Sequence, residues 1–242
     1  MNTDIMAIGA HPDDVELACG GSIAKFTQQG YKVILVDLTQ GELGTRGTKE
    51  VRTKEGEEAA RILGCQARVN LCIPDGNIEI SQDNIKKLIS TIRAYQPRLL
   101  LIPHFDERHP DHVHAHQLCK EAWFYSGLRK VETIYDGEKQ EAFRPDGYFT
   151  FMQAYEFPPT FVLDISDTYN KKIESVKAHR SQFFDPNSNE PETILSRPSF
   201  FEFLNTRARY YGETIGVQYG EPFFSPVPIG VSDIFHVITL KK

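Results

Sequence analysis

Short, largely apolar runs alternate along the chain with segments in which apolar residues recur at helical spacing. The runs cover residues 5–9, 32–38, 68–73 and 98–103. Strands that are apolar on both faces are typical of parallel sheets with helices on each side. The pattern therefore predicts an α/β fold, with a mostly parallel sheet covered by helices on both faces in a three-layer α/β/α arrangement.

The segments between these runs carry helix start and stop signals. One helix is expected from about residue 17 to near Gly30, a second over residues 50–63 with Gly64 as its cap, and a third that begins at Ser81. Glycine is common just after a helix and serine just before one. Strand and helix thus alternate over the first half of the chain.

Beyond residue 127 the alternation weakens. The elements expected there are strands over 147–154 and 161–165, a helix capped by Ser166 and reaching about residue 184, a loop over 185–191 and a helix over 200–211. The tail over 216–228 is rich in aromatic residues, Pro and Gly, which predicts a loop packed on the domain or a subunit contact. We expect one domain over residues 1–242, with the less regular part, about 128–242, packed on the sheet.

Composition narrows the class of protein. The net charge is −6 and the basic residues are scattered, which disfavours binding to nucleic acid. No apolar stretch approaches a membrane span of about 20 residues, and no signal peptide pattern opens the chain, so we expect a cytoplasmic protein without membrane contact. Four cysteines without a C-x-x-C pair predict reduced, buried thiols, at Cys19, Cys65, Cys72 and Cys119.

Two polar clusters follow apolar runs and are placed for chemistry. His11, Asp13 and Asp14 come directly after the first run, and residues 104–116 follow the fourth and hold five of the eight histidines. Ligands bind at the carboxyl ends of strands in open α/β sheets, so the clusters are expected at one edge. Together they can supply three protein ligands for a catalytic zinc ion and leave a position for water.

The spacing suggests roles and leaves some of them open. Asp13 and Asp14 should point in different directions, so that one binds metal and the other acts as general base, in either order. Each of them alone could instead be a helix N-cap. Pro110 suits the first position of a helix, which places His109 near the cap and His112 in the first turn, on one side of the helix.

These residues carry a resemblance to a known family. The segments 10–14 and 109–112 resemble the paired motifs of the PIG-L or LmbE-like zinc-dependent N-acetylglucosamine deacetylases, and 37–47, 71–76 and 104–108 resemble the bacillithiol-biosynthesis branch. The resemblance covers nearly the whole chain. It implies a Rossmann-like fold and hydrolysis of the acetamide of N-acetylglucosaminyl malate to the free amine and acetate.

The resemblance also assigns site residues. It implies one Zn²⁺ per subunit, Asp13 as the base, His109 as the group that stabilises the oxyanion, Asp111 as the partner that orients His109, and three metal ligands, His11, Asp14 and His112. A His, His, Asp site would also accept other divalent metals such as Fe²⁺. Relatives form trimers or hexamers, so we expect a homo-oligomer.

Further residues are candidates for substrate binding. The resemblance implies that Glu42, Arg52 and Asp75 hold sugar hydroxyls. Arg108 and Arg46 are candidates for a malate carboxylate, because the guanidinium offers a planar fork that matches it, although each could be a surface ion pair.

Two other functions stay open. One is a metal-dependent deacetylase of N-acetylglucosamine, chito-oligomers or another small acylamino compound. The other is a non-catalytic metal- or sugar-binding module, which would need no base, so Asp13 beside Asp14 and His109 beside His112 argue against it.

Overall fold

The computed structural model describes residues 3–183 and 189–237 of the chain. The strands are β1 (Ile5–Gly9), β2 (Val33–Asp37), β3 (Ala67–Asn70), β4 (Leu99–Pro103), β5 (Ile134–Tyr135), β6 (Glu138–Lys139), β7 (Gly147–Phe151), β8 (Phe161–Asp164) and β9 (Gly220–Phe224). The helices are α1 (Asp14–Gln28), α2 (Lys49–Leu63), α3 (Gln82–Tyr95), α4 (Pro110–Ser126), α5 (Tyr169–Ala178), α6 (Ser199–Thr214) and the 3₁₀ turn η1 (Ile234–Val237).

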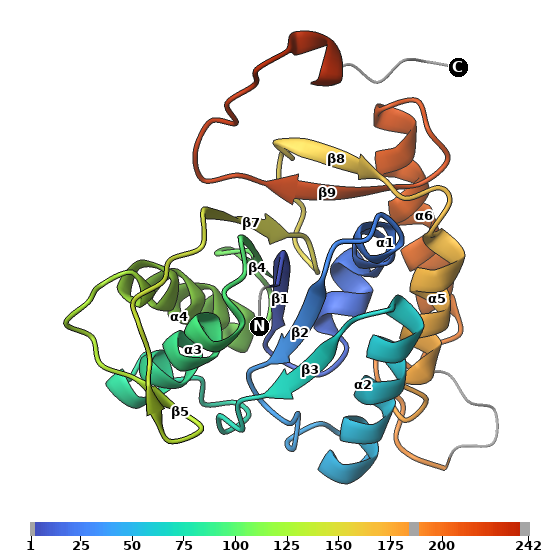
Figure 1. The fold of residues 1–242 in the computed structure, drawn as a ribbon. Helices are drawn as coiled ribbons and strands as arrows, with labels where there is room; N and C mark the ends of the chain where they lie inside the picture. The colour runs from blue at the N-terminus through green and yellow to red at the C-terminus, as the bar shows by residue number, and fades with distance from the viewer. Residues whose placement is uncertain (1–2, 184–188, 238–242) are drawn as a thin grey trace.

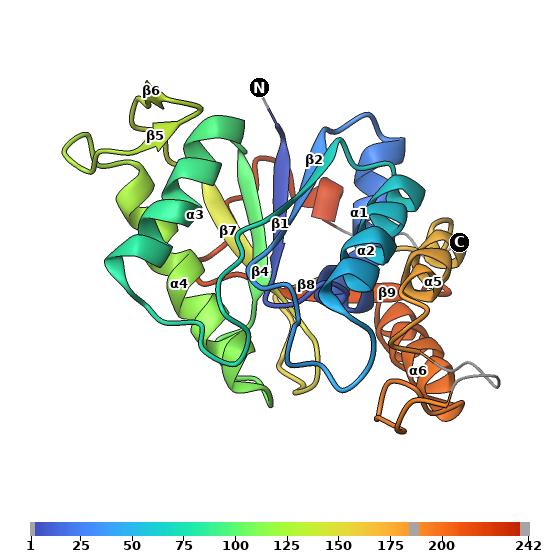
Figure 2. The same ribbon diagram turned by 90° about the horizontal axis from the view of Figure 1, so that it is seen from below.

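A seven-stranded sheet forms the centre of the molecule (Figure 1). Its strand order is β3-β2-β1-β4-β7-β9-β8, in which the first five strands are parallel and β9 is antiparallel to both neighbours. Helices α3 and α4 cover one face, and α1, α2 and α5 lie on the other, as Figure 2 shows from below. The predicted α/β class with a mostly parallel sheet is confirmed.

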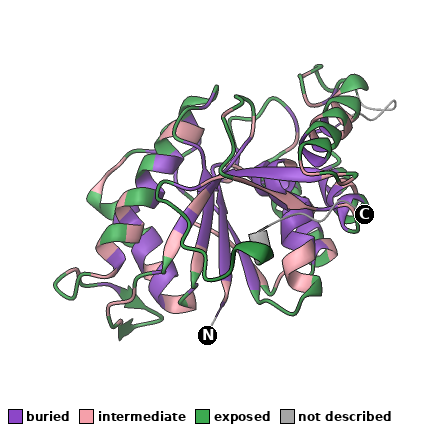
Figure 3. Cartoon of the chain, turned by 90° about the horizontal axis from the view of Figure 1, so that it is seen from above, coloured by how far each residue is buried: buried purple, intermediate pink, exposed green. Residues whose placement is uncertain are grey.

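Successive residues of the central strands face opposite layers, and both layers are buried. Met6 and Ile8 pack with the residues of α3 and α4, whereas Ile5 and Ala7 pack with those of α1 and α2. Figure 3 shows buried strands in the middle of the sheet, where β1 and β2 are buried throughout and β4 at all but its first residue. This burial on two faces explains why the first strands read as continuous apolar runs in the sequence.

The caps of the early helices are those that the sequence predicted. Gly64 follows α2 in the left-handed conformation, with φ of 76°, and the side chain of Ser81 accepts a hydrogen bond from the backbone N–H of Asn84 at the start of α3. His109 is the N-cap of α4 and Pro110 its first residue. These local signals are confirmed: Gly64, Ser81 and His109 cap helix ends, and Pro110 stands at a position where a backbone N–H would have no helical partner.

In the second half of the chain, the strands expected over 147–154 and 161–165 and the helix expected over 200–211 are confirmed as β7, β8 and α6, but two other predictions fail. The tail was expected to be a loop, but its residues 220–224 form β9 inside the sheet, where Phe223 is fully buried between β7 and β8. Helix α5 begins after Thr168 rather than Ser166, whose hydroxyl bonds to Asp164, and it ends at Ala178. Part of the expected loop over 185–191 lies outside the described residues.

The prediction of buried thiols is confirmed for Cys19 and Cys119, whereas Cys65 is half-buried and the prediction is wrong for Cys72. Cys72 is exposed, because β3 ends at Asn70 and the chain then leaves the sheet. All four cysteines are free thiols. Across residues 3–183 and 189–237, no helix combines the length and the apolar character that crossing a bilayer requires.

Helix α1 is broken in its middle, and a buried ion pair bridges the break. Cys19 has non-helical torsions, with φ of −136°. Glu221 of β9 accepts a hydrogen bond from the backbone N–H of Ser22, 2.7 Å away, and Lys172 of α5 donates to the carbonyl of Ala18 at 3.2 Å. Lys172 and Glu221 are themselves 2.5 Å apart. The pair thus satisfies backbone groups that the break leaves without helical partners.

Candidate metal centre and active site

The two polar clusters meet at the carboxyl edge of the sheet. Strands β1 and β4 are parallel neighbours, so the loop that follows β1 and the one that follows β4 leave the sheet side by side. The first loop carries His11 and leads into α1 at Asp14. The second loop ends at His109, the N-cap of α4, and His112 lies in the first turn of that helix. The imidazole rings of His11 and His112 lie 5.5 Å apart between their centres.

One group of three side chains has the geometry of a metal site. His11, Asp14 and His112 each offer a donor atom, and these atoms lie within 4.8 Å of one another. The Asp14 carboxylate lies between the imidazoles, with Oδ1 3.3 Å from His112 Nε2 and Oδ2 3.5 Å from His11 Nδ1. Ligands of a tetrahedral zinc ion, at about 2.0–2.1 Å from the metal, are separated from one another by about 3.3 Å. The donor set therefore fits a divalent cation.

The far side of the His11 ring is held by carboxylates. His11 Nε2 lies 3.0 Å from Asp75 Oδ1 and 3.2 Å from Asp111 Oδ2. Burial alone lowers the pKa of His11, but the bonds to Asp111, Asp14 and Asp75 outweigh it and raise the pKa well above the usual range. Metal-binding histidines commonly donate their second N–H to a carboxylate, which fixes the ring. Nδ1 is thus the His11 nitrogen that faces Asp14.

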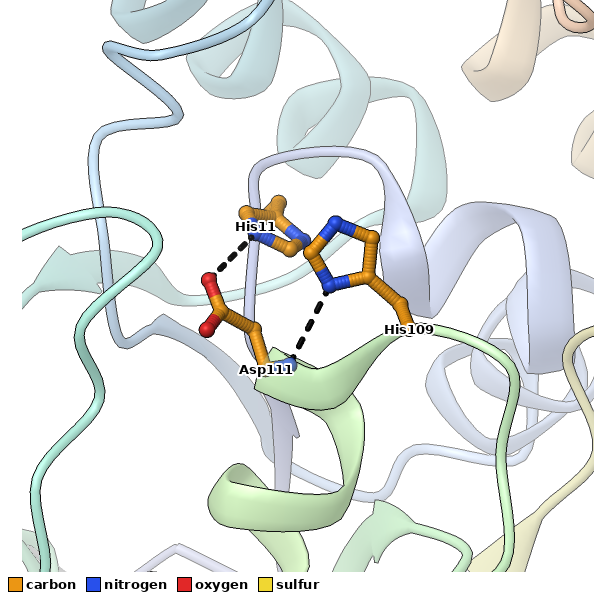
Figure 4. A group of neighbouring side chains, drawn as sticks. All are labelled: His11, His109 and Asp111. Carbon is orange, nitrogen blue, oxygen red and sulfur yellow. Dashed lines mark hydrogen bonds and ion pairs between the residues drawn. The ribbon is translucent and has the colours of Figure 1, made fainter.

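In a second group, His11, His109 and Asp111, the possible ligand atoms also lie within 4.8 Å of one another (Figure 4). In this group His109 Nδ1 accepts a hydrogen bond from the backbone N–H of Asp111, and Asp111 Oδ2 accepts one from Gly76. The Asp111 carboxylate contacts His11 rather than the ring of His109. Its hydrogen bonds therefore support His11, while its backbone orients His109.

Asp13 has a strained backbone next to Asp14. Its φ is 122°, a value that residues other than glycine rarely adopt. The buried guanidinium of Arg52 holds this turn: it donates to the Pro12 carbonyl at 2.9 Å and lies 3.4 Å from Asp13 Oδ2. Burial raises the pKa of Asp13 to about 6, with Arg52 opposing the rise and Asp14 adding to it. A carboxyl group with such a pKa is suited to general-base catalysis near neutral pH.

A pocket with a volume of about 700 Å³ opens in front of this cluster. Its lining includes His11, Asp13, Asp14, His109 and His112, together with side chains of α6. Pockets of this size accept small organic ligands. The candidate catalytic groups therefore face a space that a substrate can enter.

The structure brings some of the predicted substrate-binding residues to this pocket. Arg52, Asp75 and Arg108 line it. Two of them also form hydrogen bonds within the cluster, Arg52 with Asp13 and Asp75 with His11. Exposed Glu42 accepts a hydrogen bond from the backbone N–H of Asp75 and is not part of the lining. Arg46 also lies outside the lining and donates to the Ser181 carbonyl at 2.8 Å, with its guanidinium buried.

Sequence reasoning missed Gln153. Its side-chain amide donates to Asp14 Oδ1 at 2.8 Å, and its backbone carbonyl accepts a hydrogen bond from Arg207 of α6. Gln153 follows β7 by two residues, so its place at the carboxyl edge was a usable signal. No pattern in the sequence points to Arg207, because its contact depends on how α6 packs on the sheet.

A donor set for a divalent cation beside a buried carboxyl group, both lining one pocket, is typical of metal-dependent hydrolases, and comparisons with known proteins identify the family. Residues 6–123 match the family described as PIG-L, GlcNAc-PI de-N-acetylase. The diacetylchitobiose deacetylase of Thermococcus kodakarensis is 30% identical over 252 residues, which cover 97% of this chain and 88% of that protein. The chain belongs to this family and is an N-deacetylase, a hydrolase of N-acetyl amide bonds.

Solved structures agree with this assignment. A conserved protein from Thermus thermophilus superposes with a TM-score of 0.85 and 36% identity, covering 96% of this chain and 98% of that one. The N,N'-diacetylchitobiose deacetylase of Pyrococcus horikoshii, in complex with an inhibitor, superposes with a TM-score of 0.76 and 30% identity, covering 91% of this chain and 82% of that one. A probable N-acetyl-α-D-glucosaminyl L-malate deacetylase 2 of Bacillus anthracis is 26% identical over 74% of this chain and 81% of its own.

Proposed function

We propose that the protein removes the acetyl group from N-acetylglucosamine units of small chito-oligosaccharides, with zinc held by His11, Asp14 and His112. The single observation that carries the chemistry is Asp13, a buried carboxyl beside the ligand Asp14, at the wall of the pocket. The similarity to two diacetylchitobiose deacetylases, at 30% identity each, favours this substrate over N-acetylglucosaminyl malate.

Different residues carry out the different proton-transfer and binding steps of amide hydrolysis. A bound zinc ion supplies Lewis acidity and makes water more acidic. Asp13 accepts the proton of the water that attacks the acetyl carbonyl. Because His109 Nδ1 accepts a hydrogen bond from the backbone N–H of Asp111, the proton of a neutral His109 ring lies on Nε2, from which it can donate a hydrogen bond to the developing oxyanion. The proton that Asp13 took from the water then passes to the leaving amine. The products are acetate and the free amino sugar.

A panel of three substrates tests the proposal. N,N'-diacetylchitobiose, N-acetylglucosamine and N-acetylglucosaminyl malate are incubated with zinc-loaded protein, and both acetate and free amine are measured. We expect kcat/KM for diacetylchitobiose to exceed that for the malyl compound by about tenfold or more. A preference of that size for the malyl compound would restore the bacillithiol function instead.

The alternative function keeps the same catalytic residues and differs only in what the pocket recognises. Arg108 lines the pocket and is the arginine from which a malate contact would come. Zinc rather than another divalent ion, assembly into trimers or hexamers, and a cytoplasmic location stay predictions from the sequence.

A further inference from the structure

The carboxyl group of Asp13 is not used as a helix cap. Asp13 stands at the N-cap position of α1, but its side chain makes no cap hydrogen bond there. Its φ of 122° lies in a region that residues other than glycine rarely adopt and that persists only where the surrounding structure imposes it. The contacts that impose this conformation are therefore needed to keep the carboxyl group at the pocket wall.

Arg52 supplies contacts of this kind on both sides of the strained residue. It lies near the start of α2, and its Nη2 donates to the Pro12 carbonyl at 2.9 Å and to Asp13 Oδ2 at 3.4 Å. Nη2 thus binds the peptide that precedes Asp13 and the carboxyl group itself. Its Nη1 donates to the Gly41 carbonyl, in the loop after β2, at 2.8 Å. One guanidinium therefore joins the loops that follow β1 and β2.

The loop after β2 is shaped to admit this guanidinium. A Cβ atom at Gly41 would lie 1.9 Å from Arg52 Nη1, and one at Gly44 would lie 3.0 Å from the same atom. A side chain at Gly41 is thus incompatible with the position of the guanidinium. The Arg52 side chain is 5% exposed and already donates to two backbone carbonyls and to Asp13, which leaves little of it for a sugar hydroxyl.

We infer that Arg52 is a positioning residue, which holds Asp13 where it can accept the proton of water, and not a residue that holds sugar hydroxyls. This inference rests on the proposed function, because Arg52 acts through the base proposed there. It replaces the role that the resemblance to the deacetylase family implies for Arg52. The two roles differ in kinetics, since the loss of a sugar contact raises KM, whereas a misplaced base lowers kcat and leaves KM unchanged.

Steady-state kinetics on N,N'-diacetylchitobiose test the inference. Arg52→Lys keeps the positive charge but loses the planar fork, so we expect kcat to fall by about 10- to 100-fold while KM and zinc content stay unchanged. Arg61→Lys, a change at an exposed arginine of the same helix, is the matched control and should alter none of these. A higher KM with normal kcat would overturn the inference and restore the sugar contact, and normal values of both would overturn it as well.

A second variant leaves the arginine in place, in case Arg52→Lys does not fold. Gly44→Ala puts a Cβ atom against Arg52 Nη1 and should lower kcat in the same direction but by less. Normal kcat in Gly44→Ala, together with an unfolded Arg52→Lys, would assign Arg52 to the stability of the fold and overturn the inference.

A double-mutant cycle shows whether Arg52 acts through Asp13. Arg52→Lys should slow the wild type by the factor given above but should have almost no effect in the Asp13→Asn background, where no base is left to position. An equal loss in both backgrounds would overturn the inference and leave the proposed function standing. Absence of turnover by zinc-loaded wild type on every N-acetylated sugar would overturn the proposed function and the inference together.

Discussion

Helix α1 contacts two buried clusters of charged side chains that differ in what surrounds them. At its start, Asp14 lies with His11 and His112 at the wall of an open pocket. At its break, Lys172 and Glu221 form a pair whose side chains are 3% and 2% exposed, enclosed by α1, α5 and β9. Both clusters take charges out of water, which is costly unless partners compensate.

The comparison shows how a structural cluster is told from a functional one. The charges of the Lys172–Glu221 pair are matched within the protein and satisfy the backbone of α1, so no ligand is needed. At the pocket, by contrast, a carboxylate and two imidazoles lie within 4.8 Å of one another and line the open space. Both clusters bury charge, but only the cluster of His11, Asp14 and His112 lines a pocket.

The largest effect is expected from removing a proposed metal ligand. His112→Ala should lose zinc and, with it, all measurable deacetylation, because two protein ligands hold the ion too weakly. His114→Ala, an exposed residue of the same helix, is the control and should keep both. Metal analysis of the purified variants checks this, and full zinc content in His112→Ala would refute the assignment of that ligand.

The next largest effect is expected at the buried Lys172–Glu221 pair. Glu221→Gln keeps an oxygen that can accept from the α1 backbone but leaves Lys172 charged and unpaired in the interior. The free energy of unfolding should fall by about 3–5 kcal/mol, as measured by urea denaturation, while zinc binding by the folded protein persists. In the double variant with Lys172→Met, most of that loss should be recovered. If the double variant is as unstable as the single one, the charge is not the cause.

A third buried carboxylate, on α1 two residues after Asp14, extends the comparison to pH. Burial alone raises the pKa of Glu16, but Arg68, 2.5 Å away, and His179 outweigh it and lower the pKa from 4.5 to about 2. The folded state thus favours the ionised form, and the stabilisation of about 3 kcal/mol that is present above pH 4.5 is lost as the pH falls toward 2. The stability gap between wild type and Glu16→Gln should close over that range, and a constant gap would contradict it.

The smallest effect is expected at Gln153, which supports the metal cluster from outside. Gln153→Leu removes the donor to Asp14 Oδ1 and should weaken zinc affinity by about 10- to 100-fold, as measured by competition with a chelator. Gln117→Leu, which changes an exposed glutamine on α4, should not alter it. Unchanged affinity in Gln153→Leu would show that the contact with Asp14 does not influence the ion.

Much of the first half of the fold could be predicted from the sequence, because its strands are buried on both faces and its helices carry local caps. Ser81, Gly64 and Pro110 act within a few residues of their own position, and the sequence shows such signals directly. Strand β9 could not be predicted, because its place between β7 and β8 depends on contacts with residues about 60 to 70 positions earlier. Its Pro and aromatic residues look like a loop when they are read alone.

The candidate site, too, could be predicted only in part from the sequence. His11, Asp13 and His112 could be found because the loops after β1 and β4 carry their chemistry in short motifs. The hydrogen bond of Gln153 to Asp14 and the enclosure of Arg46 by the segment around Ser181 depend on the packing of distant elements. Residue types and spacing do not encode such contacts.

The adjacent aspartates give the most direct test of the central claim, that one neighbour holds the metal and the other moves the proton. Zinc content and kcat are measured side by side for Asp13→Asn and Asp14→Asn. The account predicts that Asp13→Asn keeps one zinc ion but loses kcat by about 10²-fold or more, whereas Asp14→Asn loses the zinc itself. If Asp13→Asn turns over normally with zinc bound, or if Asp14→Asn retains the ion, the division of roles is contradicted.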